Sequence, residues 1–416
     1  MPLDRSKEIV ITGVGLVTPI GIGKEAFWSS LANQQSGVDY RRRITSKNCF
    51  RIAAEVKDFE PKQYIRPRKS LKVMCREIQL GSAAARIAME DAGLGIGDYE
   101  PDRLGVVLGG DLFYCDPWDL EDVYRNCNAS THFEYDLYGE RAMSDIYPLW
   151  MLKHLPNMSS CHISISYDAR GPSNTIVSEE VSSLNAIIES AHIIRRGGAD
   201  VIMTGGTSCR IGITTMAFRG EIDLSRRFEE PASASRPFES SRDGMVIGEG
   251  SAVYVIESRE HAEARGANIY ARILGYGQNF HRQVKIATRN SIISALRSAS
   301  VEPHDIGHVN ANGRSTVSDD CFEASAINQT LGAVPVTAPK SFFGYLGAGS
   351  GAVELAASVL SFTHNEVPLT LNYEKPDPDC PVNVIHKEPL KPKVPTAIVL
   401  NQTPLGQAAA LVIGSP

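Results

Sequence analysis

The sequence predicts an α/β fold in which helices cover both faces of a largely parallel sheet. Short apolar runs typical of buried strands alternate with longer segments of helical periodicity, and the second half of the chain repeats the element order of the first. The 416 residues are enough for two domain-sized units or one large fused core, and no linker separates the halves. We therefore expect an internal duplication, with residues 1–260 as the N-terminal half and 261–416 as the C-terminal half.

The first half begins with an apolar run at residues 8–15 that ends in glycine and predicts a buried strand. The same pattern predicts strands at 103–110, 199–206 and 251–257, and helices are expected at 24–32, 76–93 and 183–196. Gly93 is a plausible end for the second of these helices. Residues 111–150 interrupt the alternation with many Tyr, Asp and Glu residues, and we expect an inserted cap or interface region there.

The second half has a similar rhythm. The sequence predicts strands at 269–275, 305–310, 334–338, 396–401 and 408–413, and helices at 288–300, 321–331 and 351–363. Strands and helices in this order predict a second βα unit fused to the first.

Composition and charge exclude several classes of protein. Hydrophobic residues make up 43% of the chain and charged residues 22%, as in an ordinary globular protein. No apolar run reaches the roughly 18 residues that a membrane span needs, and the first residues lack the apolar core of a signal peptide, so we expect a cytoplasmic protein. The net charge of −6 argues against a nucleic-acid partner. The eight cysteines include no CxxC pair and the ten histidines no HExxH, so neither a disulfide framework nor a metal or cofactor is predicted.

Five motifs together carry a family resemblance. They are VITGVGLVTPIG (10–21), SRPFE (235–239), RDGMVIGEG (242–250), NANGRST (310–316) and KSFFGYLGAGSG (340–351). In this order along nearly the whole chain, they resemble the β-ketoacyl-acyl-carrier-protein synthases of the thiolase superfamily. The resemblance implies the five-layered α-β-α-β-α thiolase fold, an obligate dimer, and a role in fatty-acid or polyketide assembly.

The resemblance also implies that the catalytic triad of the family is missing. Glu180 falls on the position of the nucleophilic cysteine, and Asn312 and Tyr345 stand in the places of the two histidines. A carboxylate cannot form the thioester that carries the growing acyl chain. Other positions of the family pattern are retained: Lys340, Asp320 and Glu323.

One branch of the family has this profile. Residues 177–186, VSEEVSSLNA, resemble the VSEQAGGLDA of chain-length-factor subunits, with Glu180 in place of glutamine. The first hypothesis is thus a non-catalytic, chain-length-factor-like subunit that pairs with an active ketosynthase and shapes the acyl tunnel. A second is a homodimeric enzyme that uses Glu180 for decarboxylation, hydrolysis or transfer of an acyl thioester. A third is a scaffold that binds carrier-bound acyl chains.

The substituted positions also have plain structural interpretations. Ser178 can cap a helix whose first turn holds two acidic residues, where carboxylates are favoured. Asn312 and Tyr345 can fill space and satisfy each other's hydrogen bonds, and Lys340 can be the buried partner of Glu323. A displaced nucleophile is not expected, because neighbours in a strand, such as Cys161 and His162, point to opposite faces.

Two further segments are assigned through the resemblance. Pro404, Leu405 and Gly406 match the loop that gates the acyl tunnel, and Pro404 makes this loop less mobile than its glycine-rich counterpart. Four basic residues precede the helix that begins at residue 76: Arg66, Arg68, Lys69 and Lys72. They match a region that docks acyl carrier protein in the family. The alternative is that they form a solvated charged turn. The strand near Thr175–Ser178 matches the edge at which family dimers join, and aromatic residues of 111–150 would add anchors.

Overall fold

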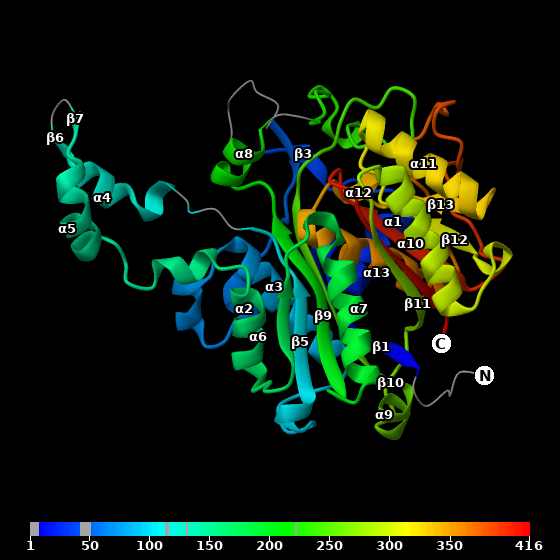
Figure 1. The fold of residues 1–416 in the computed structure, drawn as a ribbon, viewed down its shortest axis with the longest axis horizontal. Coiled ribbons are helices and arrows are strands. Elements are labelled where there is room, and N and C mark those ends of the chain that lie inside the picture. Colours follow the sequence, from blue (N-terminus) through cyan, green and yellow to red (C-terminus); the bar gives the residue numbers. More distant parts are fainter. Residues whose placement is uncertain (1–7, 42–50, 113–114, 116, 130–131, 221–222) are drawn as a thin grey trace.

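The computed structural model describes residues 8–41, 51–112, 115, 117–129, 132–220 and 223–416 (Figure 1). The strands of the first half are β1 (Ile9–Thr18), β5 (Leu104–Gly109), β8 (Ser173–Ile176), β9 (Val201–Cys209) and β10 (Glu249–Ser258), with β2 (Gly21–Ile22) beside β1. Those of the second are β11 (Ala271–Phe280), β12 (His308–Asn310), β13 (Pro335–Thr337), β14 (Asn383–Val384), β15 (Thr396–Gln402) and β16 (Gln407–Gly414). Short hairpins pair β3 (Val38–Tyr40) with β4 (Ile52–Ala54) and β6 (Asn128–Ala129) with β7 (His132–Phe133).

The two halves share one strand order, which confirms the predicted duplication. The order is β8-β5-β9-β10-β1 in the first half and β13-β12-β15-β16-β11 in the second, so each runs third, second, fourth, fifth, first. A short antiparallel pairing of Ile9–Ile11 with Ala271–Ile273 joins the halves. The boundary between residues 260 and 261 stays a prediction.

The prediction of a largely parallel sheet was wrong, because the sheet is mixed. The strands β5, β8 and β9 pair in parallel, as do β12, β13, β14 and β15, whereas β1, β10, β11 and β16 pair antiparallel with their neighbours. In the second half, β15 and β16 follow one another across a tight turn, and strands joined in this way pair antiparallel. In the first half, β9 and β10 also pair antiparallel, although a short helix at Ile213–Arg219 lies between them in the chain.

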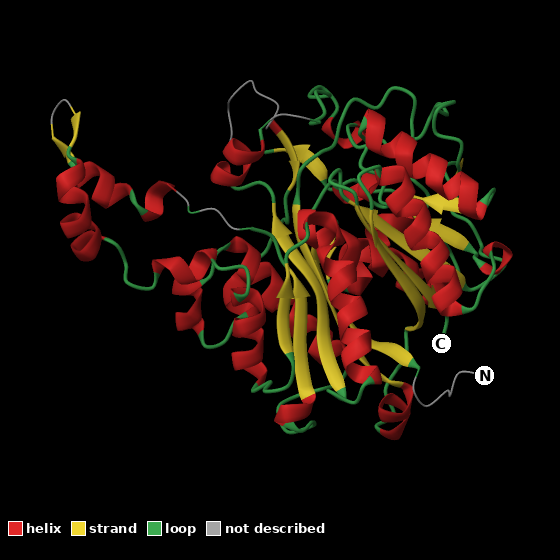
Figure 2. Cartoon of the chain, in the orientation of Figure 1, coloured by secondary structure: helices red, strands yellow, loops and turns green. Residues whose placement is uncertain are grey.

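The strands of the two halves form two layers, and helices form the three layers that lie between and outside them (Figure 2). The helices are α1 (Lys24–Ala32), α2 (Pro61–Tyr64), α3 (Arg76–Asp91), α4 (Glu121–Asn126), α5 (Tyr135–Asp145), α6 (Met158–Tyr167), α7 (Ser182–Arg195), α8 (Ile213–Arg219), α9 (Arg259–Ala264), α10 (Val284–Ala299), α11 (Val317–Leu331), α12 (Lys340–Phe343) and α13 (Ser350–His364). The middle layer is α7 with α13, which contact strands of both halves, while α3 and α6 cover one outer face and α10 and α11 the other. The five layers implied by the resemblance are therefore present.

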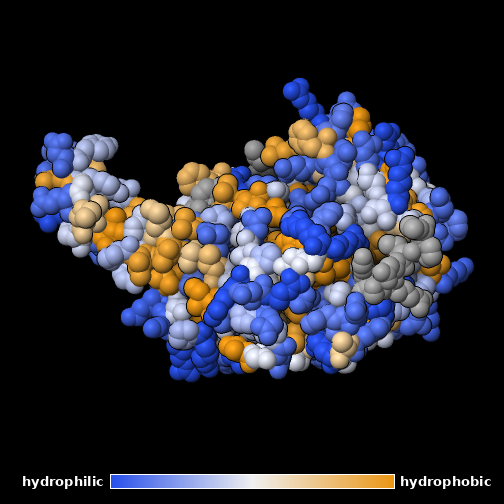
Figure 3. Space-filling view, turned by 60° about the horizontal axis from the view of Figure 1, so that its bottom comes forward, coloured by the Kyte–Doolittle hydropathy of each residue, from blue (hydrophilic) through white to orange (hydrophobic). Residues whose placement is uncertain are grey.

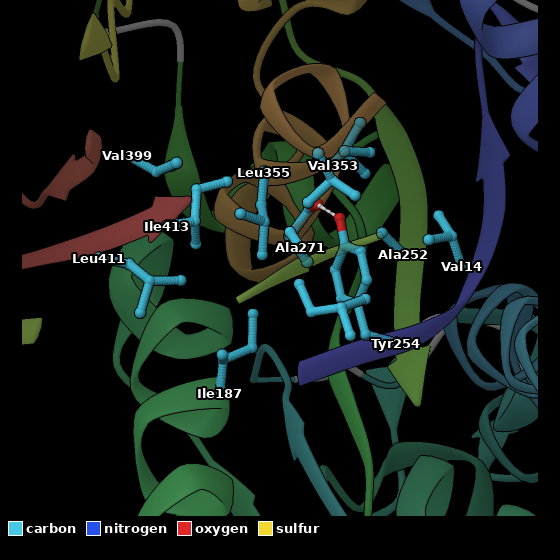
Figure 4. Packing of buried hydrophobic residues seen from close by; sticks show 14 of the residues in the cluster. Val14, Ile187, Ala252, Tyr254, Ala271, Val353, Leu355, Val399, Leu411 and Ile413 are labelled. Atoms are coloured by element: carbon cyan, nitrogen blue, oxygen red, sulfur yellow. Dashed lines mark hydrogen bonds between the residues drawn. The ribbon is translucent and has the colours of Figure 1, made fainter. Parts of the chain in front are cut away.

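The middle layer carries the main hydrophobic core. In Figure 4, Tyr254 of β10 lies among Ile187, Val353 and Leu355 of the two central helices, and its hydroxyl donates a 2.6 Å hydrogen bond to the carbonyl of Ala352. Small residues let the outer helix α3 lie close to strand β1. A Cβ on Gly15 of β1 would lie 1.9 Å from the carbonyl of Ala84 in α3, so only glycine fits at this position of the strand.

The inserted region forms an arm that extends away from the body, made of residues 117–129 and 132–149 with α4, α5 and the β6–β7 hairpin (Figure 1). The aromatic rings of Tyr124, Phe133 and Tyr138 pack on one another within it. Tyr114, one of the aromatics predicted to act in an interface, lies outside the described residues. In the described part of the chain, no helix is long and apolar enough to cross a membrane.

Candidate functional site

The substituted positions meet at the edge of the middle layer, where four segments converge. These are the turn before α7, the loop after β12, the segment from α12 to the start of α13, and the end of β15. A Cβ on Gly109, at the end of β5, would lie 2.5 Å from the backbone nitrogen of Ser183, so only glycine lets the turn before α7 sit this close to the sheet.

Glu180 lies in a single 3-10 turn, Glu179–Val181, immediately before α7, and its side chain is 1% exposed. The predicted side-chain cap by Ser178 was wrong. The hydroxyl of Ser182 instead bridges the turn, accepting a 2.7 Å hydrogen bond from the Ser178 backbone N–H and donating a 2.6 Å bond to the Glu179 carbonyl. Glu179 has a φ of 54°, in the left-handed region. The prediction that both acids belong to the first turn of the helical segment is confirmed.

The buried carboxylate of Glu180 is paired with Arg314, a residue that the sequence analysis did not single out. The Oε1 of Glu180 lies 3.1 Å from Nε of Arg314, and both side chains are nearly inaccessible. Neither atom makes a well-directed hydrogen bond to the other or to another described residue, so the contact is an ion pair at close range. Nη1 of Arg314 donates a 2.7 Å bond to Asp319. Burial by itself lowers the pKa of Arg314, but Glu180 and the other neighbouring charges outweigh it and raise the pKa above its ordinary value.

Tyr345 lies between two guanidinium groups. Arg210 is 5.3 Å and Arg314 5.2 Å from the centre of its ring, which are cation–π distances. Burial raises the pKa of the Tyr345 hydroxyl well above its ordinary value, so the side chain remains neutral. The prediction that Tyr345 and Asn312 satisfy each other's hydrogen bonds was wrong, because the two are held by different partners.

Asn312 belongs to a second buried network around Lys340. Nζ of Lys340 donates to the carbonyl and to Oδ1 of Asn312 at 2.8 and 2.7 Å, and it forms a close ion pair with Glu354. Asn401 donates to the same Oδ1 of Asn312 at 3.0 Å and to Glu354 at 2.7 Å. Burial raises the pKa of Glu354, while Lys340 lowers it in part. The sequence analysis suggested Glu323 as the buried partner of Lys340, but in the structure the partner is Glu354.

Glu323 and Asp320 fold the loop that carries Asn312 and Arg314. The two oxygens of Glu323 accept the backbone N–H groups of Asn312 and Gly313 at 2.7 and 2.8 Å. Asp320 accepts those of Ser315 and Phe238 at 3.1 and 2.9 Å. Burial raises the pKa of Glu323 to about 7 and that of Asp320 to about 6, although the backbone donors oppose the shift. Both carboxyls therefore position the loop through its backbone.

A further charge cluster surrounds Glu179. Arg210, 2% exposed, donates to Asp111 at 2.7 Å and to Glu179 at 2.9 Å, and Arg219 of α8 donates to Glu179 at 3.0 Å. Burial by itself raises the pKa of Glu179, but Arg210 and Arg219 outweigh it and hold the pKa below its ordinary value. The cavity that remains beside Tyr345 and these two arginines has a volume of only about 40 Å³. That is room for a few water molecules and too little for an acyl chain within this chain alone.

Two cysteines bear on the expectation that the chain has no displaced nucleophile, Cys161 and Cys209. Cys161 and His162 are neighbours in helix α6, not in a strand as the prediction assumed, and burial lowers the pKa of His162. Cys209 ends β9 with its Sγ 3.4 Å from a carboxylate oxygen of Glu249. Burial, together with Glu249, raises the pKa of Cys209 well above its ordinary value, which removes the thiolate that a nucleophile needs.

The remaining predicted residues are exposed, apart from the buried Gly406. Pro404, Leu405 and Gly406 form the tight turn between β15 and β16, closed by a 3.0 Å hydrogen bond from the Gly406 N–H to the Thr403 carbonyl. Gly406 has a φ of 94°, a conformation that favours glycine, and the Leu405 side chain is 71% exposed. The basic residues before α3 are all exposed on and beside a 3-10 helix at Arg68–Val73: Arg66, Arg68, Lys69 and Lys72.

The sequence signal for Arg314 was present but was not used. The motif at 310–316 resembles the family's NAHGTST, with Arg314 in place of its first threonine, and Glu180 falls where the resemblance places the nucleophile. A gained acid and a gained base in two separate motifs are the pattern of a compensating ion pair. Arg210, Arg219 and Glu354 have no comparable signal, because their roles depend on contacts between distant segments.

Comparisons with known proteins agree with this geometry. Residues 6–262 match the family model of the β-ketoacyl synthase N-terminal domain, and residues 270–374 match that of the C-terminal domain. The chain is 34% identical to a 3-oxoacyl-[acyl-carrier-protein] synthase 2 of Coxiella burnetii over 95% of both chains.

Two solved structures are similar over almost the whole chain. The ishigamide ketosynthase/chain length factor is 28% identical, covers 98% of this chain and 99% of its own, and has a TM-score of 0.85. A type II PKS acyl-carrier protein in complex with its ketosynthase, AntDE:AntF, contains a chain that is 27% identical with the same coverage and a TM-score of 0.82.

Proposed function

Because the chain belongs to the β-ketoacyl synthase family, we propose that it is a ketosynthase-fold subunit of fatty-acid or polyketide assembly that does not itself condense acyl units. It pairs with an active 3-oxoacyl-ACP synthase and shapes the acyl tunnel, as a chain-length factor. The observation that carries the proposal is the buried ion pair between Glu180 and Arg314.

This ion pair occupies the place at which acyl transfer would begin. A nucleophile at the start of α7 would have to be a thiol or hydroxyl that can form an acyl bond and release it again. Glu180 is instead a carboxylate held at 3.1 Å by a guanidinium, and the ring of Tyr345 lies against the same guanidinium. The pairing also argues against the alternative in which Glu180 acts as a general base, because its Oε1 already faces the guanidinium of Arg314 in the interior of the protein.

The two other substituted positions offer no replacement for a base. The amide of Asn312 has no titratable group, and its Oδ1 is already bonded to Lys340 and Asn401. The hydroxyl of Tyr345 stays neutral at physiological pH because burial raises its pKa. Decarboxylation of a malonyl unit and stabilisation of the resulting enolate would therefore lack the groups that the family resemblance assigns to them.

Two surfaces support pairing with another ketosynthase-fold chain. Strand β8 is the last strand of its side of the sheet, paired with β5 only among the described strands, and an unpaired edge is a hazard unless a partner covers it. The arm exposes large apolar and aromatic side chains: Trp118, Tyr135, Met143, Tyr147 and Leu149. Figure 3 shows hydrophobic surface, drawn in orange, where the arm joins the body. The similarity to a ketosynthase/chain length factor supports a heterodimer. A homodimer would cover the same surfaces.

The proposal extends to the acyl carrier protein. Arg66, Arg68, Lys69 and Lys72 present an exposed basic face next to α3 that would attract an acidic carrier protein, and one similar structure contains such a protein bound to its ketosynthase. The turn at Pro404–Gly406 would border the tunnel of the pair. Its tight hydrogen bonding and proline make it a fixed rim and not a moving gate.

Co-expression with ketosynthases from the same source tests the pairing. We expect a one-to-one heterodimer in the native mass of the intact complex. Val177→Arg, which places a charge beside the β8 edge, should abolish it, whereas Ile96→Arg, an equally drastic change at an exposed loop before β5, should leave it intact. A lone chain that stays a stable monomer with every ketosynthase, or a Val177→Arg variant that still pairs normally, would refute this part of the proposal.

A further inference from the structure

Two cysteines that are far apart in the sequence meet beside the loop that carries Arg314. Cys321 lies in the first turns of α11, and Cys380 follows the turn that begins at Asp377. They are 59 positions apart, and their sulfur atoms lie 3.7 Å from each other. Cys380 is 2% exposed and Cys321 is half-buried, so an oxidant from solvent reaches the sulfur of Cys321 first.

A cation lies directly against this pair. Nη2 of Arg242 is 3.1 Å from the sulfur of Cys321, and Nη1 is 2.5 Å from Asp377, whose carboxylate lies 3.9 Å from the sulfur of Cys380. Arg242 is further fixed by the carbonyls of Glu239 and Thr316 at 2.9 and 3.0 Å. The guanidinium is thus held in one place directly beside the sulfur of Cys321.

The same cation argues against a metal at this cluster. The sulfurs and the Asp377 carboxylate lie within 4.8 Å of one another, close enough to share an ion. However, Arg242 already contacts both Cys321 and Asp377, and a divalent cation would have to displace it from the interior. A dithiol reaction needs no such displacement, because the sulfurs are already in contact.

We propose that Cys321 and Cys380 form a reversible disulfide when the protein meets a peroxide. The sulfur of Cys321 attacks one oxygen of hydrogen peroxide and the O–O bond breaks. The hydroxide that leaves takes up the proton of the Cys321 thiol and becomes water, and the sulfur becomes a sulfenic acid. Cys380 then attacks that sulfur. The S–S bond forms as the S–O bond breaks, and the departing hydroxide takes the Cys380 proton as water. Overall, two thiols are oxidised, and one peroxide is reduced to two water molecules.

The disulfide would tie the start of α11 to the turn at residues 377–380. The same turn of α11 holds Asp320, which accepts the N–H of Ser315 and so fixes the loop that carries Arg314. Oxidation therefore acts on the framework that carries Arg314 of the Glu180–Arg314 ion pair. It is independent of whether the protein condenses acyl units.

The test uses the purified full chain, treated with hydrogen peroxide and digested without reductant. We expect a single cross-linked peptide pair containing Cys321 and Cys380, lost again on treatment with dithiothreitol. Hydrogen exchange of the backbone at residues 312–321 should slow in the oxidised protein. Cys161→Ser, another half-buried cysteine, serves as the matched control and should cross-link like the unchanged chain.

The single variants separate the two steps. Cys380→Ser should accumulate a sulfenic acid at Cys321 that a dimedone probe labels, whereas Cys321→Ser should leave Cys380 unlabelled under the same conditions. The proposal is overturned if the unchanged chain, folded by its melting profile, forms no such cross-link while its other cysteines are oxidised. It is equally overturned if the first variant shows no dimedone adduct at Cys321.

Discussion

Replacing Arg314 by methionine should destabilise the protein strongly, because it leaves the carboxylate of Glu180 without its cation. Glu180 is 1% exposed and cannot turn to solvent without opening the turn before α7. Asp319 would lose its 2.7 Å bond to Arg314 but keep the 2.9 Å bond from the Thr316 hydroxyl. Removing one partner of a buried ion pair typically costs about 3–5 kcal/mol. We therefore expect the free energy of unfolding to fall by about 4 kcal/mol.

A double variant separates the stranded charge from the lost packing. Glu180→Gln combined with Arg314→Met removes both charges, so at least half of the lost stability should return. The free energy of unfolding is measured by urea titration at one protein concentration, with Arg297→Met on the exposed face of α10 as the control. A loss below about 1 kcal/mol for Arg314→Met, or a double variant as unstable as the sum of the two single ones, would refute the reasoning.

Three further predictions concern pH, the nucleophile and the arm. Burial raises the pKa of Glu323 to about 7 in the folded protein, so its contribution to stability is present below about pH 4.5 and is lost as the pH rises to about 7. Urea titrations across this range should show a loss of up to about 3 kcal/mol in the free energy of unfolding, and Glu323→Gln should remove that loss. If the free energy of unfolding of the variant and of the unchanged chain falls with pH at the same slope, the prediction is contradicted. Glu180→Cys should accept an acyl group yet form no 3-oxoacyl product, because no base is restored; a condensing single variant would show that the histidine positions are wrongly assigned. Tyr135→Ser with Met143→Ser should weaken subunit pairing in sedimentation at least about tenfold without changing the melting temperature, whereas Ile96→Ser should not; unchanged pairing would exclude the arm from the interface.

Most of the elements could be predicted because their patterns are local. The predicted strands at 103–110 and 408–413 and the helices at 24–32 and 183–196 agree with the structure to within one or two residues. Strand direction could not be predicted in the same way. Whether β10 pairs with β1 in parallel or antiparallel depends on which connection carries a crossover helix, and apolar periodicity does not record it.

The candidate site was predicted in its positions but not in its contacts. Motifs singled out Glu180, Asn312, Tyr345 and Lys340, and the structure brings their segments together at the edge of the middle layer. The partners could not be predicted because they come from elements distant in the chain. The carboxylate that pairs with Lys340 is on α13, and the cation that pairs with Glu180 is in the loop after β12.

The most direct measurement of the central claim is the mass of acyl carrier protein after reaction with malonyl and acyl carrier-protein thioesters. With the purified chain alone, we expect no 3-oxoacyl product above the uncatalysed background, since loss of a nucleophile and its bases costs roughly 10⁴- to 10⁶-fold in rate. With its partner ketosynthase present, the product should appear, and it should change in chain length when residues of this chain at the shared tunnel are altered. A 3-oxoacyl product formed by the chain alone, at the rate of an ordinary synthase, would contradict the account.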